Sequence, residues 1–325
     1  MPRFKDYVPQ GVIPATLAAF DTDYEFNWAE TRRHLAFTAD VDGVTAITVN
    51  GHASEVHACT FDEQTRMMDE AADEIGDRMP LICGVYTDGS HEAVRIAKMA
   101  EAHGASALLC FPPNSFGMGG IQHRPEMGIR HMKMIAEATD LPMIVFQYSN
   151  ELGYPLDTLV QICEDVPSVK AIKDWSPPQV HERHIKTLHA LSRPIKVLST
   201  NSAWLMSSLV MGADGLLSGA GSVIADLQSA LFRAVQAKNM ATAQKLADRI
   251  YYTTQVFYSD PFGDMHNRMK EALLLLGRID GPAVVRPPLM KLTETEIAVI
   301  AEAMTAAGIA RDGASGLSFP ALAAE

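Results

Sequence analysis

PLICGVYTDGSHEAVRIAKMAEAHGASALLCF, residues 80–111, decides the fold. The stretch begins with the apolar run Pro80–Val85, passes through a polar loop into the amphipathic segment Ser90–Gly104, and ends in a second apolar run, Ala105–Phe111. Runs that are nearly continuous in Val, Ile, Leu and Ala, rather than alternating with polar residues, are typical of parallel strands buried on both faces. The stretch therefore predicts one strand–helix–strand unit.

The same unit repeats along the chain to about residue 220. Eight strands alternating with helices predict an α/β fold, specifically a (β/α)₈ TIM barrel. The main alternative is a doubly wound open sheet, which needs a glycine-rich phosphate turn after its first strand. AAFDTDYEF, residues 18–26, provides no such turn. The eight apolar runs are Gly11–Phe20, Gly43–Asn50, Pro80–Val85, Ala105–Phe111, Pro142–Tyr148, Val169–Lys173, Ile195–Ser199 and Asp214–Gly219.

After the eighth run the pattern is purely helical. Residues 222–257, 264–277 and 293–308 predict about three helices with no strand between them. We therefore expect residues 1–221 to form the barrel and residues 222–308 to form a helical extension packed on it. Residues 309–325 are small and polar, which predicts a loose tail.

Composition excludes several classes of partner. Apolar residues make up 47% of the 325-residue chain, enough for a large core, and the formal net charge is −12. An acidic protein repels nucleic acid and anionic membranes, so neither is an expected partner. An anionic small molecule remains possible, because a pocket can be electropositive inside an acidic protein.

The cysteines and the N-terminus bear on the compartment. The four cysteines are far apart and contain no Cys-x-x-Cys pair, which predicts free thiols in a reducing compartment. The N-terminal residues MPRFKDY have no apolar signal-peptide core. No apolar run reaches the length of about 18 residues that a membrane span needs. We therefore expect a cytoplasmic protein.

Lys173 is the strongest candidate for catalysis. It ends the apolar run Val169–Lys173, and active sites of TIM barrels lie at the C-terminal ends of the strands. Burial there disfavours the ammonium ion and lowers the pKa, which leaves a neutral nucleophilic amine. Such an amine can form an imine with a ketone. On position alone, a solvated lysine just past a strand explains the pattern equally well.

Two other strand ends carry polar groups. The turn Asn50–Glu55 follows the second strand, and Gly51 would let the amides of His52 and Ala53 form a nest for a carboxylate. An ordinary capped turn is the alternative. Tyr148 follows the fifth strand and could transfer protons, although a packed tyrosine accounts for it as well.

Two histidines three residues apart, His181 and His184, raise the question of a metal site. No third ligand stands at a recognisable spacing, and Pro177 and Pro178 introduce the segment like a surface helix. We therefore predict no metal there.

Together these residues resemble the dihydrodipicolinate synthase/N-acetylneuraminate lyase family of class I lyases. The resemblance runs from Gly11 to about residue 308. The matching elements are Gly11–Ala15 with Phe20-Asp21, the turn Asn50–Glu55, Cys83–Val85, Phe111–Pro113, Ala171–Asp174, Gly212–Gly219 and Arg286–Pro288.

The resemblance implies a mechanism and an assembly. Lys173 would form an imine with a pyruvate-like 2-oxo acid, without a metal or an organic cofactor. The turn residues Gly51, His52 and Ala53 would hold the substrate carboxylate. The chain would form a homotetramer built as a dimer of dimers. The other substrate-binding residues implied by the resemblance are Phe146, Leu217 and Ser218.

Departures from the family pattern change the expected chemistry. Phe146 stands where the family usually has a proton-shuttling tyrosine, and His52-Ala53 replaces the Thr-Thr pair of the synthases. Glu151 falls at or near the arginine that binds a second carboxylate, which argues against dihydrodipicolinate synthesis. Tyr148 faces the same side of the strand as Phe146, and His52 has an ordinary pKa near neutrality. Our hypothesis is that Tyr148, His52 or both handle protons.

Three functions remain open from the sequence. The first is an aldolase or lyase acting on a 2-oxo acid and an aldehyde. The second is a dehydratase of a keto-deoxy sugar acid, with or without decarboxylation. The third is a non-catalytic barrel that binds a 2-oxo acid. Trp175, Phe116 and Met118 could line an apolar pocket for a neutral or aromatic aldehyde.

Overall fold

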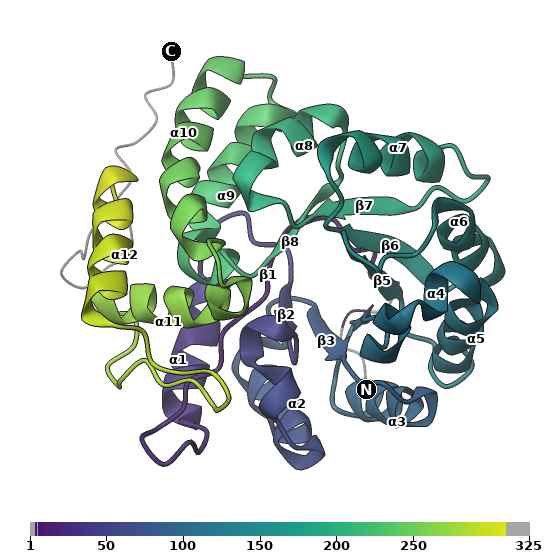
Figure 1. The fold of residues 1–325 in the computed structure, drawn as a ribbon, viewed down its shortest axis with the longest axis horizontal. Coiled ribbons are helices and arrows are strands. Elements are labelled where there is room, and N and C mark those ends of the chain that lie inside the picture. The colour runs from purple at the N-terminus through teal and green to yellow at the C-terminus, as the bar shows by residue number, and fades with distance from the viewer. Residues whose placement is uncertain (1–3, 5, 310–325) are drawn as a thin grey trace.

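The computed structural model describes residue 4 and residues 6–309. Its centre is a sheet of eight parallel strands in the order β1-β8-β7-β6-β5-β4-β3-β2. Isolated parallel bridges join Val12 to Val44 and Ala15 to Thr48, so the first and last strands of this order meet and close the sheet (Figure 1). The predicted (β/α)₈ TIM barrel is confirmed.

All eight predicted strands form, seven of them shorter than the apolar run and β6 one residue longer. The strands are almost entirely buried because helices cover the outer face and side chains fill the interior. Their bounds are β1 Gly11–Pro14, β2 Ile47–Val49, β3 Leu81–Val85, β4 Ala107–Cys110, β5 Met143–Gln147, β6 Val169–Asp174, β7 Lys196–Ser199 and β8 Gly215–Ser218.

Helices alternate with these strands around the barrel. The α-helices are α1 Trp28–Ala39, α2 Phe61–Ile75, α3 Ser90–Ala102, α4 Gly120–His123, α5 Pro125–Ala136, α6 Leu156–Asp165, α7 Pro178–His189, α8 Leu205–Met211, α9 Gly221–Gln236, α10 Met240–Phe257, α11 Met265–Leu275 and α12 Glu294–Ala306. Short 3₁₀ turns are η1 His52–Ser54, η2 Val56–Ala58, η3 Asn114–Met118, η4 Ser202–Trp204 and η5 Phe262–Asp264. None of the helices in the described part of the chain is long and apolar enough to cross a membrane.

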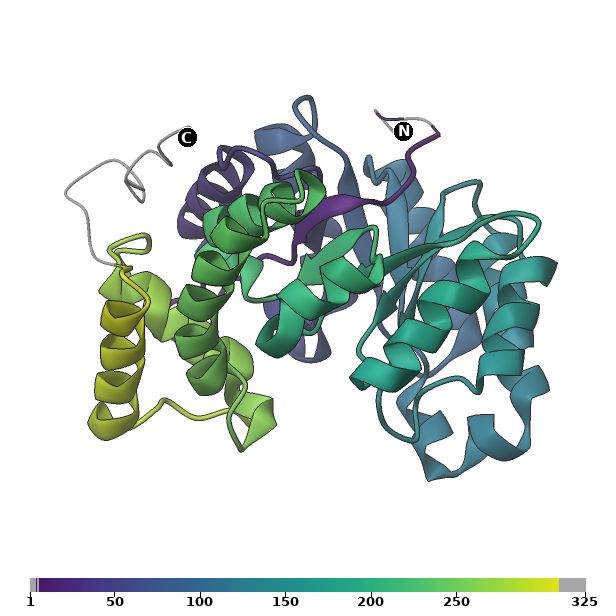
Figure 2. The same cartoon turned by 90° about the horizontal axis from the view of Figure 1, so that it is seen from above.

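The helices after β8 divide into two groups. Helix α9 packs on β1 and β8, so it takes the place of the barrel's eighth helix although the sequence grouped it with the extension. Helices α10, α11 and α12 pack on one another at one side of the barrel, as Figure 2 shows from above. The division at residue 221 stays a prediction. The predicted loose tail lies outside the described residues except for Ile309, which is buried.

A buried ion pair fastens the extension to the turn after β2. The Lys270 ammonium on α11 donates to Glu55 Oε1 at 2.5 Å and to the Val284 carbonyl at 2.7 Å. The Arg286 backbone N–H donates to Glu55 Oε2 at 2.9 Å. Both charged side chains are almost fully buried, so each charge is compensated by the opposite charge of its partner instead of by water. This pair fixes the position of α11 relative to the β2 turn.

Replacing Lys270 by Met should lower the free energy of unfolding by about 3–5 kcal/mol, because Glu55 would stay buried without its cation. Urea titration of the two proteins measures the difference. Lys133→Ala is the control, since its ion pair with Asp165 is exposed and should be worth about 1 kcal/mol or less. The double variant Lys270→Met/Glu55→Gln should recover part of the loss. Equal stability of Lys270→Met and the parent would contradict this role.

Candidate active site

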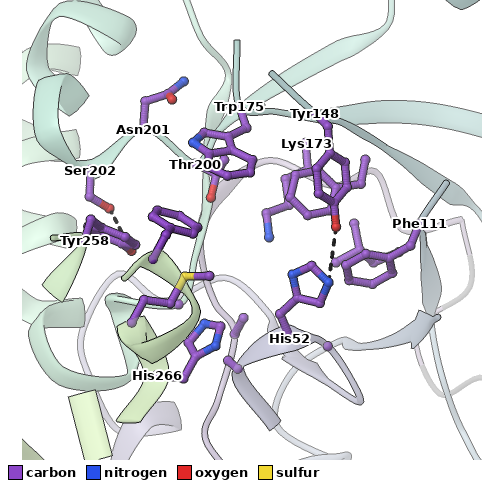
Figure 3. Close-up of a pocket in the computed structure, with 18 of the residues that line it drawn as sticks. His52, Phe111, Tyr148, Lys173, Trp175, Thr200, Asn201, Ser202, Tyr258 and His266 are labelled. Carbon is purple, nitrogen blue, oxygen red and sulfur yellow. Dashed lines mark hydrogen bonds between the residues drawn. The ribbon is translucent and has the colours of Figure 1, made fainter. Parts of the chain in front are cut away.

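A cavity of about 400 Å³ opens at the C-terminal ends of the strands. Figure 3 shows its lining side chains, which come from the barrel on one side and from the C-terminal helices on the other. Six predicted site residues line it: Gly51, His52, Ala53, Phe146, Tyr148 and Lys173. The structure therefore brings together residues that lie up to 122 positions apart in the sequence (173 − 51).

Lys173 lies near the end of β6 with its side chain only 7% exposed. In the barrel it pairs with Phe146 on β5 and with Leu198 on β7. Its Nζ atom lies 4.1 Å from the centre of the Phe146 ring. Burial lowers the pKa of Lys173 from its ordinary value to about 7. A large fraction of the amine is therefore neutral at physiological pH and can attack a carbonyl carbon.

Tyr148 and His52 form a hydrogen-bonded pair in the lining of the cavity. The Tyr148 hydroxyl lies 3.1 Å from His52 Nε2. Burial, reinforced by the charge of Lys173, lowers the pKa of His52 to about 3, and burial raises the pKa of Tyr148. Both groups are therefore neutral at pH 7, and they share one hydrogen bond whose donor depends on the tautomer of His52. Phe146 and Tyr148 face the same side as predicted, with ring centres 4.3 Å apart.

The turn after β2 presents free backbone donors. The N–H groups of Ser54 and Glu55 are used by the carbonyls of Gly51 and His52. Those of His52 and Ala53 have no acceptor within the described residues, so they can receive a carboxylate. The turn lies close against β3, where a Cβ on Gly84 would approach the Asn50 carbonyl oxygen to 2.0 Å. Only glycine at position 84 allows the turn this position.

Another wall of the cavity is aromatic, and of its rings only Trp175 was predicted from the sequence. Trp175, which follows β6, stacks on Phe262 of η5 with ring centres 4.9 Å apart and planes 19° apart. Tyr258, just after α10, lies 6.0 Å from Phe262. The Tyr258 hydroxyl accepts from the Ala220 N–H at 3.3 Å. The other unpredicted lining residues include Thr200, Asn201, Ser202, Met265 and His266.

Position in the sequence could have identified some of these residues. Thr200, Asn201 and Ser202 directly follow β7, where the strand-end rule predicts site residues. Phe262 and His266 carry no such signal, because they belong to the helical extension. Burial lowers the pKa of His266 well below its ordinary value, so its imidazole is neutral in the cavity.

Some predicted residues do not line this cavity. Leu217 is fully buried beside Ile13 in the β1–β8 ladder, and the Ser218 hydroxyl is bonded to Ser202 Oγ at 3.0 Å. The cavity begins one residue later, at Gly219. Of the predicted apolar pocket only Trp175 contributes. Phe116 packs near His131, and Met118 is 87% exposed.

The two histidines of α7 are buried, so the prediction of a surface helix was wrong for this face. His181 Nδ1 and His184 Nδ1 each lie 2.8 Å from Asp174 Oδ2, and His181 Nε2 lies 2.7 Å from Ser208 Oγ. Their inward face follows from the spacing of His181, His184, Ile185 and Leu188 on one side of the helix. Among the described residues, no group of three or more His, Cys, Asp or Glu side chains is arranged to hold a metal ion.

The chain is similar to known proteins of one family. A model of the dihydrodipicolinate synthetase family matches residues 8–307. The 4-hydroxy-tetrahydrodipicolinate synthase of Chloroherpeton thalassium is 26% identical over 311 residues, which cover 94% of this chain and 97% of that protein.

Solved structures share the fold. YagE of E. coli K12, a prophage protein of the dihydrodipicolinic acid synthase family solved in complex with pyruvate, superposes with a TM-score of 0.85 at 19% identity. The match covers 92% of this chain and 99% of that one. A monomeric dihydrodipicolinate synthase variant gives a TM-score of 0.83 at 21% identity, with 93% and 97% covered. The homotetramer stays a prediction for this chain.

Replacing Lys173 by Met should stabilise the fold, because burying the lysine ammonium costs desolvation free energy and so lowers the free energy of unfolding. Below pH 7 the lysine is charged in both the folded and the unfolded chain, so the full cost applies. Above pH 7 the folded chain loses the proton first, and the cost disappears as pH approaches 10.5, the ordinary value. The Met variant should therefore be more stable by roughly 2–4 kcal/mol at pH 6, with a difference that narrows toward pH 10.

Urea unfolding at several pH values measures this difference. Lys170→Met provides the control, since Lys170 lies on the same strand but is only half-buried. A stability difference for Lys173→Met that does not change with pH would contradict the lowered pKa.

Proposed function

Because the chain belongs to the dihydrodipicolinate synthetase family, we propose that it forms or cleaves a carbon–carbon bond next to an imine between Lys173 and a pyruvate-like 2-oxo acid. The family makes the chain a lyase of the aldolase type. The predicted enzyme class is therefore confirmed, and a non-catalytic barrel is not proposed. The observation that carries the proposal is the desolvated Lys173 amine inside a cavity that also holds free backbone N–H donors and the hydrogen-bonded Tyr148–His52 pair.

Imine formation uses the neutral form of Lys173. The Nζ lone pair attacks the carbonyl carbon of the 2-oxo acid, and the resulting carbinolamine loses its hydroxyl as water after gaining one proton. The product is a protonated imine, whose positive charge draws electrons from the neighbouring C–C or C–H bond. The face of the Phe146 ring, 4.1 Å from Nζ, favours this cation electrostatically.

The turn after β2 supports the binding of the substrate carboxylate. The free N–H groups of His52 and Ala53 are donors at one end of the cavity. Hydrogen bonds from backbone amides to a carboxylate are charge-assisted and therefore stronger than those between neutral groups. The bound carboxylate would also bring a negative charge to His52, which favours the protonated imidazole that is unfavourable in the empty site.

The Tyr148–His52 pair accounts for proton transfer without a tyrosine at position 146. During cleavage, the phenol oxygen takes the proton of the substrate hydroxyl while it passes its own proton to His52 Nε2. The C–C bond then breaks, leaving an enamine on Lys173 and releasing the aldehyde. The pair returns the proton to the enamine carbon, and hydrolysis of the imine releases the 2-oxo acid. The 3.1 Å distance between hydroxyl and imidazole permits this exchange.

Borohydride reduction in the presence of pyruvate should attach the pyruvyl group covalently to Lys173. Peptide mass spectrometry locates the modified residue. Lys173→Arg should abolish the modification, because a guanidinium does not form the imine, whereas Lys170→Arg should retain it. Modification at Lys170 or at no lysine would contradict the proposed function.

Replacing Tyr148 by Phe should lower turnover by roughly 10²- to 10⁴-fold, because one partner of the proton-exchanging pair is lost. Imine trapping at Lys173 should persist. His52→Asn should also lower turnover while imine trapping at Lys173 persists. Turnover is measured with the aldol substrate as released pyruvate plus aldehyde. Product with an intact carbon skeleton minus water would instead identify the dehydratase alternative.

Tyr154→Phe is the matched control for the tyrosine variant. Tyr154 is buried nearby, and its hydroxyl has no hydrogen-bond partner in the described structure. Its replacement should leave turnover unchanged. Full activity in both Tyr148→Phe and His52→Asn would rule out the pair as the proton carrier.

A further inference from the structure

The cavity is larger than a 2-oxo acid requires. It encloses about 400 Å³, whereas a cavity of about 150 Å³ is enough to hold a benzene molecule. With a pyruvyl group on Lys173 and its carboxylate at the β2 turn, the remaining space lies toward the C-terminal helices. This space can take a ring-sized group attached to the reacting carbon.

An aromatic wall bounds this remaining space. The Trp175–Phe262 stack and Tyr258 form a continuous series of rings. Trp175 also meets Tyr148 edge to face, with ring centres 5.8 Å apart, so the wall begins beside the proton-exchanging pair. Rings in this arrangement bind another aromatic ring by stacking and by edge-to-face contact.

The lining contains no partner for a second charge. Among the described lining residues, Lys173 is the only ammonium or guanidinium group, and no Asp or Glu is present. The imidazoles of His52 and His266 are neutral because burial lowers the pKa of each. A second carboxylate would lose its hydration without compensation, and an ammonium group would also face the positive imine.

Two of the polar side chains beside the aromatic wall, Asn201 and Ser202, are engaged with the protein itself. The Asn201 side-chain amide donates to the Asp174 carbonyl at 3.2 Å. The Ser202 hydroxyl is bonded to Ser218 Oγ at 3.0 Å and contacts the Tyr258 hydroxyl at 3.4 Å. These two side chains therefore have little hydrogen-bonding capacity left for a chain of several hydroxyls, as in a sugar aldehyde.

We propose that the second substrate is an uncharged aldehyde carrying an aromatic ring, and that the ring binds against Trp175 and Phe262. The inference rests on the proposed function, since it concerns the partner of the imine at Lys173. In the condensation direction, the enamine carbon attacks the aldehyde carbon and the new alkoxide takes a proton from the Tyr148–His52 pair. Hydrolysis then releases an aryl-substituted 4-hydroxy-2-oxo acid.

A comparison of three aldehydes tests the substrate class. Pyruvate is offered with benzaldehyde, with glyceraldehyde, or with 4-oxobutanoate, which carries a carboxylate. The condensation product is measured by mass spectrometry, and kcat/KM is determined for each aldehyde. Benzaldehyde should exceed each of the others by roughly tenfold or more, since desolvating an unpaired polar or charged group is unfavourable.

Borohydride trapping in the same samples tests the imine at Lys173 separately from the class of aldehyde. If pyruvate labels Lys173 but 4-oxobutanoate or glyceraldehyde reacts as well as benzaldehyde, or no aldehyde reacts, the aromatic class is wrong and the imine stands. If pyruvate and other 2-oxo acids leave Lys173 unlabelled, the proposed function itself fails.

Variants of the wall test the location of the ring. Phe262 is only half-buried in a short 3₁₀ turn, so Phe262→Ala should fold normally. The variant should raise KM for benzaldehyde by roughly tenfold while pyruvate trapping stays unchanged. Phe262→Arg should shift preference toward 4-oxobutanoate. Met118→Ala, on the exposed η3 turn outside the cavity, should alter neither measurement. An unchanged KM in Phe262→Ala would place the ring elsewhere and overturn the inference.

Discussion

Burial of the Lys173 amine is the constraint on which the rest of the site depends. An ammonium ion at this position loses its water, and the described lining offers no carboxylate in return. The amine therefore gives up its proton near neutral pH. The fold can hold so unfavourable a group because the surrounding strands β5, β6 and β7 are buried except at Lys170 and Lys196, and their close packing keeps the lysine in place. The same closed barrel that stabilises the chain thus creates the nucleophile.

The surroundings of the lysine follow the same logic. A neutral imidazole, a protonated phenol and aromatic rings are compatible with a cavity of low polarity, and they keep it so. The fixed donors are the backbone amides of His52 and Ala53, which bind an anion without adding a charged side chain. The buried Glu55–Lys270 pair places its charges behind the turn rather than in the cavity, and it holds the C-terminal helices where they complete the aromatic wall.

The sequence was informative where local pattern and strand ends decide the outcome. Continuous apolar runs predicted all eight strands, and the position of Lys173 predicted a residue in the barrel mouth. Phe146 and Tyr148 were placed correctly by the two-residue period of a strand. The spacing of His181, His184, Ile185 and Leu188 also indicates that one face of α7 is buried. The two prolines before the helix suggested a surface helix instead.

Long-range packing accounts for what the sequence could not predict. Phe262, Tyr258 and His266 reach the cavity only because α10 and α11 fold back beside the barrel, and no local pattern records that contact. At a strand end, a difference of one or two residues decides whether a side chain lines the cavity. Leu217 and Ser218 lie within β8, and the first residue after them that lines the cavity is Gly219. Phe116 and Met118 follow β4 but turn away from the mouth in η3, and helical periodicity did not distinguish α9 from the extension.

The most direct test of the account is the pKa of the Lys173 amine in the folded, ligand-free protein. It can be measured by NMR as the pH titration of the lysine ¹³Cε signal, assigned by its absence in Lys173→Met. We expect the Lys173 signal to titrate with a midpoint near pH 7. A midpoint for Lys173 near 10.5, the ordinary value, would show that the amine is charged at neutral pH and would contradict the central claim.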